Sequence, residues 1–204
     1  MPAECNFKVF RTYIFDMDGT LVEFNLPFEK IREELGIKGR YILESIMKDS
    51  RKEEKLEILK KYEIRAARRA KLMPYAREIL EIIEGAGCKK GIVTRNCRES
   101  VEIVASRFDL SLDFVITRDD APPKPSPEPI KLALRVVSAR PYEAITVGDY
   151  IFDVVAGKLA GTKTALLLNE KNESFAEQAD FVIRCLSELQ KFILDSNYHT
   201  QLLD

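Results

Sequence analysis

The sequence predicts an α/β fold: a parallel β-sheet with helices on both faces, and a small all-helical segment inserted into it. Short apolar runs alternate with amphipathic segments along most of the chain, which is typical of a parallel sheet crossed by helices. Residues 24–73, in contrast, show helical spacing and no strand pattern. With 204 residues, 46% hydrophobic and 32% charged, the chain can bury a core without disulfide or metal staples.

The predicted strands share an apolar composition and end at polar turns. The first, Val9–Phe15, is rich in β-branched and aromatic residues and stops at an acidic, glycine-bearing turn. The others are Gly91–Thr94, Phe114–Thr117, Ala144–Val147, Lys163–Leu168 and Phe181–Ile183.

Amphipathic helices are predicted between these strands. Pro74–Glu84 is closed by Gly85 and Gly87, and Pro127–Ser138 carries proline in its first turn. The remaining predicted helices of this part are Cys97–Phe108, Phe152–Ala160 and Leu186–Leu194. The alternation places helices on both faces of the sheet.

The inserted segment is predicted to contain three helices, Phe28–Leu35, Tyr41–Met47 and Arg51–Leu72. We therefore expect an α/β domain of residues 1–23 and 74–204 and a helical domain of residues 24–73. Arg51–Lys71 holds nine basic and four acidic residues. This excess fits either a solvated helix face or a basic lid that attracts an anionic substrate.

Charge and composition exclude several classes of function. Lys+Arg number 32 and Asp+Glu 33, so no global field favours nucleic acid or an anionic membrane, and neither is expected as a partner. His199 is the single histidine, which argues against a histidine base or a histidine metal centre. Four cysteines without a CxxC pair, and no signal peptide or membrane span, predict a cytoplasmic protein with reduced thiols.

Polar residues follow four of the predicted strands. Because ligands in open α/β sheets bind beyond the carboxyl ends of the strands, we expect these residues to converge on one pocket. In chain order they are Asp16, Asp18, Thr94, Arg95, Lys124, Asp149 and Asp153.

The chemistry of this set favours a magnesium ion and a phosphate group. Four carboxylates in one pocket need more positive charge than one lysine provides, and oxygen-only donors favour Mg²⁺ over zinc. The Thr94 hydroxyl, the Lys124 charge and the backbone N–H groups around Gly19 suit phosphoryl oxygens.

The spacing of these residues resembles the motifs of the haloacid dehalogenase superfamily of phosphotransferases. The matching segments are Asp16–Val22 (DMDGTLV), Ile92–Thr94, Lys124–Pro127 and Gly148–Asp153. The resemblance implies a Rossmann-like core with a small helical cap, as in the branch of phosphoglycolate phosphatase and β-phosphoglucomutase.

The resemblance also implies roles for individual residues. Asp16 would be the nucleophile and Asp18 the general acid and base. Mg²⁺ would be held by Asp16, by Asp18 through its backbone carbonyl, and by Asp149, with support from Asp153. Phosphoryl oxygens would be bound by Thr94 and Lys124, which also assists catalysis. Arg95 is interpreted as either a second phosphate ligand or a surface residue.

The function predicted first is a Mg²⁺-dependent phosphatase that hydrolyses a small phosphorylated metabolite through an aspartyl-phosphate. A carboxylate nucleophile is ionised at neutral pH, which agrees with the lack of a catalytic histidine. Alternatives are a phosphomutase and a non-catalytic regulatory protein on the same scaffold. A signalling receiver domain is disfavoured by chain length and by Asp18. The chain is expected to be a monomer or a homodimer.

Overall fold

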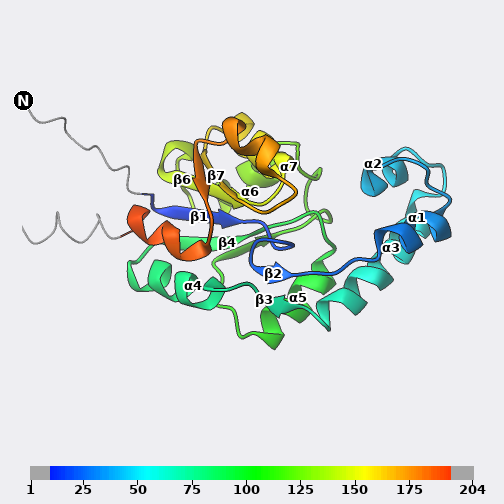
Figure 1. Cartoon of the computed structure of the whole chain (residues 1–204), viewed down its shortest axis with the longest axis horizontal. Helices are drawn as coiled ribbons and strands as arrows, with labels where there is room; N and C mark the ends of the chain where they lie inside the picture. The colour runs from blue at the N-terminus through cyan, green and yellow to red at the C-terminus, as the bar shows by residue number, and fades with distance from the viewer. Residues whose placement is uncertain (1–9, 194–204) are drawn as a thin grey trace, which may run out of the picture.

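The computed structural model describes residues 10–193, so His199 and the predicted helix end at Leu194 lie outside it. A six-stranded, fully parallel sheet has the order β5-β4-β1-β6-β7-β8, with β1 (Thr12–Phe15) near its centre (Figure 1). The other strands are β4 (Lys89–Val93), β5 (Phe114–Ile116), β6 (Ala144–Gly148), β7 (Lys163–Leu167) and β8 (Phe181–Ile183).

Alternate residues of the buried strands face two separate cores. Tyr13 and Phe15 pack into a core with α4 (Ala76–Gly85), α5 (Arg98–Arg107) and the 3-10 helix η3 (Leu186–Phe192). Ile14 packs into a second core with α6 (Glu128–Val136) and α7 (Ile151–Ala160). In Figure 1 these two groups of helices lie on opposite sides of the sheet. The predicted fold class is therefore confirmed. Two short 3-10 helices, η1 (Pro141–Glu143) and η2 (Glu173–Gln178), complete the connections.

Three helices lie between β2 (Val22–Glu23) and β3 (Lys71–Leu72), and we call them the helical insertion. They are α1 (Phe28–Leu35), α2 (Ile42–Met47) and α3 (Lys52–Ala67). They share a small core of their own, which includes Ile31, Ile46 and Leu59. In Figure 1, α1 and α2 project beyond the sheet while α3 runs back to it.

The base of the helical insertion corrects one prediction. The helix predicted to reach Leu72 ends at Ala67, and Lys71–Leu72 pairs in antiparallel fashion with Val22–Glu23. The backbone hydrogen bond from Met73 N–H to the Leu21 carbonyl continues this ribbon. Pairing with a segment some fifty positions away thus replaces the last predicted helical turn. The last predicted helix is likewise a 3-10 helix, Leu186–Phe192.

None of the helices in residues 10–193 is both long enough and apolar enough to cross a membrane.

Candidate active site

The carboxyl ends of three neighbouring strands define the site. Asp16 directly follows β1, Thr94 follows β4 and Asp149 follows β6, and these strands are adjacent in the sheet. They open on a cleft of about 790 Å³ whose other wall is formed by the helical insertion. Of the residues predicted from sequence, those that line it are Asp16, Asp18, Thr94, Arg95, Asp149 and Asp153.

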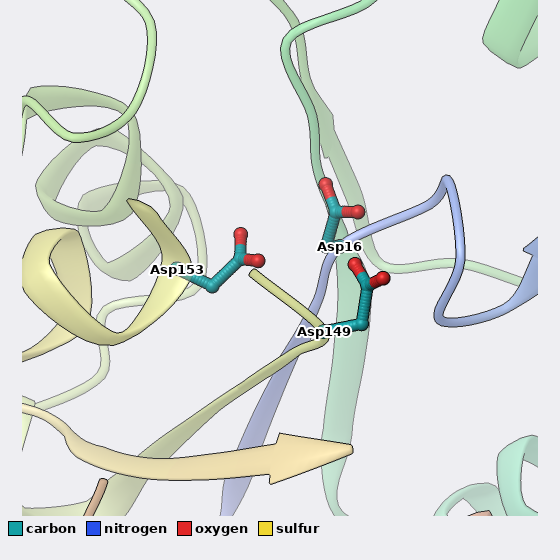
Figure 2. Close-up of side chains that lie close together, drawn as sticks. All are labelled: Asp16, Asp149 and Asp153. Atoms are coloured by element: carbon teal, nitrogen blue, oxygen red, sulfur yellow. The ribbon is translucent and has the colours of Figure 1, made fainter. Parts of the chain in front are cut away.

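Three carboxylates form a compact cluster at the base of the cleft. Asp16, Asp149 and Asp153 each offer an oxygen, and these oxygens all lie within 4.8 Å of one another. Figure 2 shows the carboxylate groups gathered from the ends of β1 and β6 and from the first turn of α7. The side chain of Asp18 lines the cleft but is not a member of this cluster.

Lys124 lies beneath the cluster rather than in solvent. Its side chain comes from the proline-rich loop after β5 and is only 2% exposed. The ammonium group donates to Asp16 Oδ1 at 2.7 Å and to the Val93 carbonyl at 2.6 Å, and lies 2.6 Å from Asp153 Oδ1. Three carboxylates against one ammonium leave two negative charges at full ionisation, which a divalent cation would balance.

The pKa values of the site show the same shortage of positive charge. Burial, then the charges of Asp16 and Asp153, raises the pKa of Asp149 to about 8. Burial raises the pKa of Asp16 to about 6, although Lys124 opposes this rise. Burial, followed by the charges of Asp16 and Asp149, holds the pKa of Asp18 well above its usual range. Asp18 is thus suited to carry a proton.

Two glycines allow the carboxylates to approach the backbone. Gly19 has a φ of +79°, and a Cβ there would lie 2.5 Å from Asp149 Oδ2. A Cβ at Gly148 would lie 2.2 Å from Asp153 Cγ. All the donor atoms of the cluster are oxygens, and Gly19 and Gly148 leave the space that lets the carboxylates of Asp149 and Asp153 lie close to the backbone. These observations fit a hard divalent cation.

The turn after β4 is held by hydrogen bonds on every side. The Thr94 hydroxyl accepts a hydrogen bond from Asn96 N–H at 3.3 Å, and Thr94 lines the cleft. Arg118 holds this turn through the carbonyl groups of Arg95 and Asn96. The Asn96 side chain also lines the cleft, and its buried Nδ2 has no hydrogen-bond partner within residues 10–193. Sequence analysis assigned Asn96 no role.

The guanidinium group of Arg95 is engaged on three sides. It donates to the Lys124 carbonyl and, at 2.7 Å, to Glu44 Oε1 of α2. Its Cζ lies 4.7 Å from the centroid of the Phe152 ring. Arg95 lines the cleft as predicted, but its present partners are protein groups.

Glu63 of α3 is a second residue that sequence analysis missed. It is 2% exposed and accepts hydrogen bonds from Arg118 and, at 3.1 Å, from Cys97 N–H. In the sequence, Glu63 is one of the four acidic residues of the charged segment Arg51–Lys71, and nothing there marks it as buried. None of the nine basic residues of Arg51–Lys71 lines the cleft, whereas Leu59 and Glu63 of the same helix do. The interpretation as a basic lid is therefore not supported.

The fold and the acidic cluster at the carboxyl edge of the sheet define a class of hydrolase. The sequence profile described as haloacid dehalogenase-like hydrolase matches residues 22–167, and the chain belongs to this family.

Curated relatives agree with this assignment. The chain is 30% identical over 207 residues to an uncharacterized hydrolase of Saccharomyces cerevisiae, covering 93% of this chain and 94% of the relative. It is 30% identical over 205 residues to phosphoglycolate phosphatase of Aquifex aeolicus, covering 90% and 96%. It is 38% identical over 126 residues to pyrophosphatase PpaX of Bacillus cereus, covering 59% and 58%.

Solved structures share the fold. A hydrolase from Pseudomonas syringae superposes with a TM-score of 0.71 at 23% identity, covering 90% of this chain and 97% of that one. A haloacid dehalogenase phosphatase from Thermococcus onnurineus gives 0.67 at 24% identity, covering 89% and 96%.

Proposed function

We propose that this hydrolase is a Mg²⁺-dependent phosphatase that cleaves a small phosphomonoester through an aspartyl-phosphate. The observation that carries the proposal is the environment of Asp16, a buried carboxylate at the base of the cleft, held by Lys124 beside two further carboxylates. Two of the curated relatives are named phosphoglycolate phosphatase and pyrophosphatase, which supports phosphoryl chemistry.

Asp16, Asp149 and Asp153, with the backbone carbonyl of Asp18, are the proposed ligands of the metal. When bound, Mg²⁺ supplies positive charge that neutralises the carboxylates and the substrate phosphate. The oxygen-only donor set and the close approach at Gly19 support this choice.

In the first half-reaction, a carboxylate oxygen of Asp16 attacks phosphorus and the bond from phosphorus to the leaving oxygen breaks. Asp18, whose pKa is well above its usual range because of burial and the nearby charges of Asp16 and Asp149, donates its proton to that oxygen. Thr94, which lines the cleft, binds a phosphoryl oxygen, and Lys124 stabilises the charge in the transition state from beneath the cluster, where it holds Asp16 and Asp153.

In the second half-reaction, Asp18 is ionised and removes a proton from a water molecule. The resulting hydroxide attacks phosphorus, the bond to Asp16 breaks, and inorganic phosphate forms. Asp16 returns as a carboxylate and Asp18 regains its proton, so the enzyme is restored.

The helical insertion is proposed to act as the cap of this site, with residues 24–73 as the cap domain and 1–23 with 74–204 as the core domain. Its helices close one wall of the cleft and exclude water from the reacting phosphate. A volume of about 790 Å³ suits a small metabolite.

The test is a panel of phosphomonoesters assayed with Mg²⁺ and with EDTA, ranked by kcat/KM. Asp16→Asn should lower kcat by roughly 10³-fold or more, because the nucleophile is lost with little change in volume. Asp109→Asn is the matched control, since it makes the same change at an exposed position outside the cleft and should leave kcat unchanged.

Turnover by Asp16→Asn near the wild-type rate, or activity unaffected by EDTA, would contradict the proposal. Dependence of the reaction on a bisphosphate activator, with return of the phosphoryl group to the product, would identify a phosphomutase instead.

A further inference from the structure

The helical insertion meets the rest of the protein at two places with different character. On the α3 side, the buried pair of Glu63 and Arg118 fixes the insertion to the turn after β4. On the α2 side, the contact is partly open to solvent. There, Glu44 is paired with Arg95, and the side chain of Glu44 is 35% exposed and that of Arg95 is 25% exposed.

The α2 contact continues through aromatic rings to α7. The ring of Tyr41, at the start of α2, has its centroid 5.4 Å from that of the Phe152 ring, and Arg95 packs against the same Phe152 ring. Three residues of this contact, Tyr41, Arg95 and Phe152, line the cleft.

Arg95 joins this contact to the reacting centre. One end of its guanidinium donates to Glu44 and the other to the backbone carbonyl of Lys124. The side chain of the same lysine donates to Asp16 Oδ1 at 2.7 Å. Hydrogen bonds at the two ends of Lys124, its backbone carbonyl and its ammonium group, therefore link Arg95 and Glu44 to the carboxylate of Asp16.

Glu44 depends on Arg95 for its charge balance. Its second carboxylate oxygen, Oε2, is buried and has no hydrogen-bond partner in the described part of the chain. Without Arg95, the contact of α2 with the core would bury the carboxylate of Glu44 without a partner of opposite charge, which would weaken that contact.

We propose that Arg95 is a positioning residue that couples the contact of α2 with the core to the placement of Lys124, and through it to Asp16. The inference rests on the proposed function of the cleft. It gives Arg95 a role different from a phosphate ligand, because both terminal nitrogens of its guanidinium group donate to protein oxygens and the Phe152 ring lies against the group. It also makes Glu44, a residue with no place in the reaction itself, a determinant of rate.

The test is a double-mutant cycle with p-nitrophenyl phosphate and Mg²⁺. We expect Arg95→Gln to lower kcat about 30-fold and Glu44→Gln about tenfold, since small displacements of reacting groups carry large penalties in rate. KM should change by less than about threefold in both. The double variant should be no slower than Arg95→Gln alone, because Glu44 acts only through Arg95 and its replacement removes the unpaired carboxylate. Arg95→Lys, which keeps the charge for Glu44, should retain more kcat than Arg95→Gln.

Lys60→Gln is the matched control. Lys60 and Glu99 form another ion pair between the insertion and the core, at 2.9 Å, but lie outside the cleft. This variant should leave kcat unchanged. Thermal melting followed by circular dichroism verifies that each variant is folded, and the conservative Glu44→Gln keeps the test decisive if Arg95→Gln is unstable.

A direct phosphate ligand gives a different pattern, which would overturn the inference. In that case Arg95→Gln would raise KM strongly, Glu44→Gln would leave kcat intact, and the double variant would behave as Arg95→Gln does. If the wild type hydrolyses no phosphomonoester, the proposed function fails separately. The affinity for inorganic phosphate in the presence of Mg²⁺ then distinguishes the coupling role of Arg95 from a ligand role. Coupling predicts weaker binding, about twofold to threefold, in both Glu44→Gln and Arg95→Gln. A ligand role predicts unchanged or tighter binding in Glu44→Gln.

Discussion

Without divalent cations, this protein should lose stability as the pH rises from 6 to 8. The group responsible is Asp149, whose pKa is raised by burial and by the charges of Asp16 and Asp153 to about 8, against 3.8 in an unfolded chain. Over this pH range the folded protein holds a proton that the unfolded chain has released. The free energy of unfolding therefore falls as the pH rises.

The magnitude follows from linkage. One extra proton bound by the folded state changes the free energy of unfolding by about 1.4 kcal/mol per pH unit. Asp149 is almost fully protonated at pH 6 and about half protonated at pH 8, so the loss over this interval is about 2 kcal/mol. A bound divalent cation favours the ionised carboxylate and should remove the dependence.

The measurement is urea unfolding at pH 6, 7 and 8, with EDTA and with Mg²⁺. Asp149→Asn is the control, because it removes the titrating group and keeps the volume. In EDTA this variant should be more stable than the wild type at pH 8 and should show a flatter pH dependence. If the metal-free wild type is as stable at pH 8 as at pH 6, and the slope is the same in the variant, the account of the acidic cluster is wrong.

Three further perturbations test the site and the fold. Lys124→Met should destabilise the metal-free protein by about 3 kcal/mol in urea unfolding, because buried carboxylates lose their ammonium partner, and Mg²⁺ should restore part of this. Gly19→Ala should lower the free energy of unfolding by about 1–2 kcal/mol, since the positive φ at this position is strained for alanine. It should also weaken Mg²⁺ binding in calorimetric titration, because the new Cβ would displace the carboxylate of Asp149. Asp180→Asn should lower the free energy of unfolding by about 1 kcal/mol at pH 7 in urea unfolding. Despite burial, hydrogen bonds from Lys163 and Thr164 hold the pKa of Asp180 below its usual value. The difference between variant and wild type should therefore shrink as the pH falls below about 4.

Much of the fold was predictable because its signals are local. The bounds of α1, Phe28–Leu35, and of β8, Phe181–Ile183, agree with the sequence pattern. Apolar runs that end at polar turns were sufficient to find the six strands of the parallel sheet. The ribbon of Val22–Glu23 and Lys71–Leu72 was not found, because two residues carry no periodicity and their pairing depends on the fold of everything between them.

The site divides in the same way. Asp16, Thr94 and Asp149 were found because the ends of adjacent parallel strands must meet. The pairs of Arg95 with Glu44 and of Arg118 with Glu63 were not, because they join residues 51 and 55 positions apart through the seating of helices on the core. A charged residue on an amphipathic helix gives no sign of which side chain it will meet.

The antiparallel ribbon at the base of the helical insertion has a consequence for how this protein can be altered. The register of Glu23 with Lys71 brings the two residues that flank the insertion side by side, about 5 Å apart at their Cα atoms. A two-residue hairpin turn can span that distance. The three helices can therefore be exchanged at this ribbon without a change in the order of the parallel strands, provided that the partners of Arg95 and Arg118, which are Glu44 and Glu63, are kept.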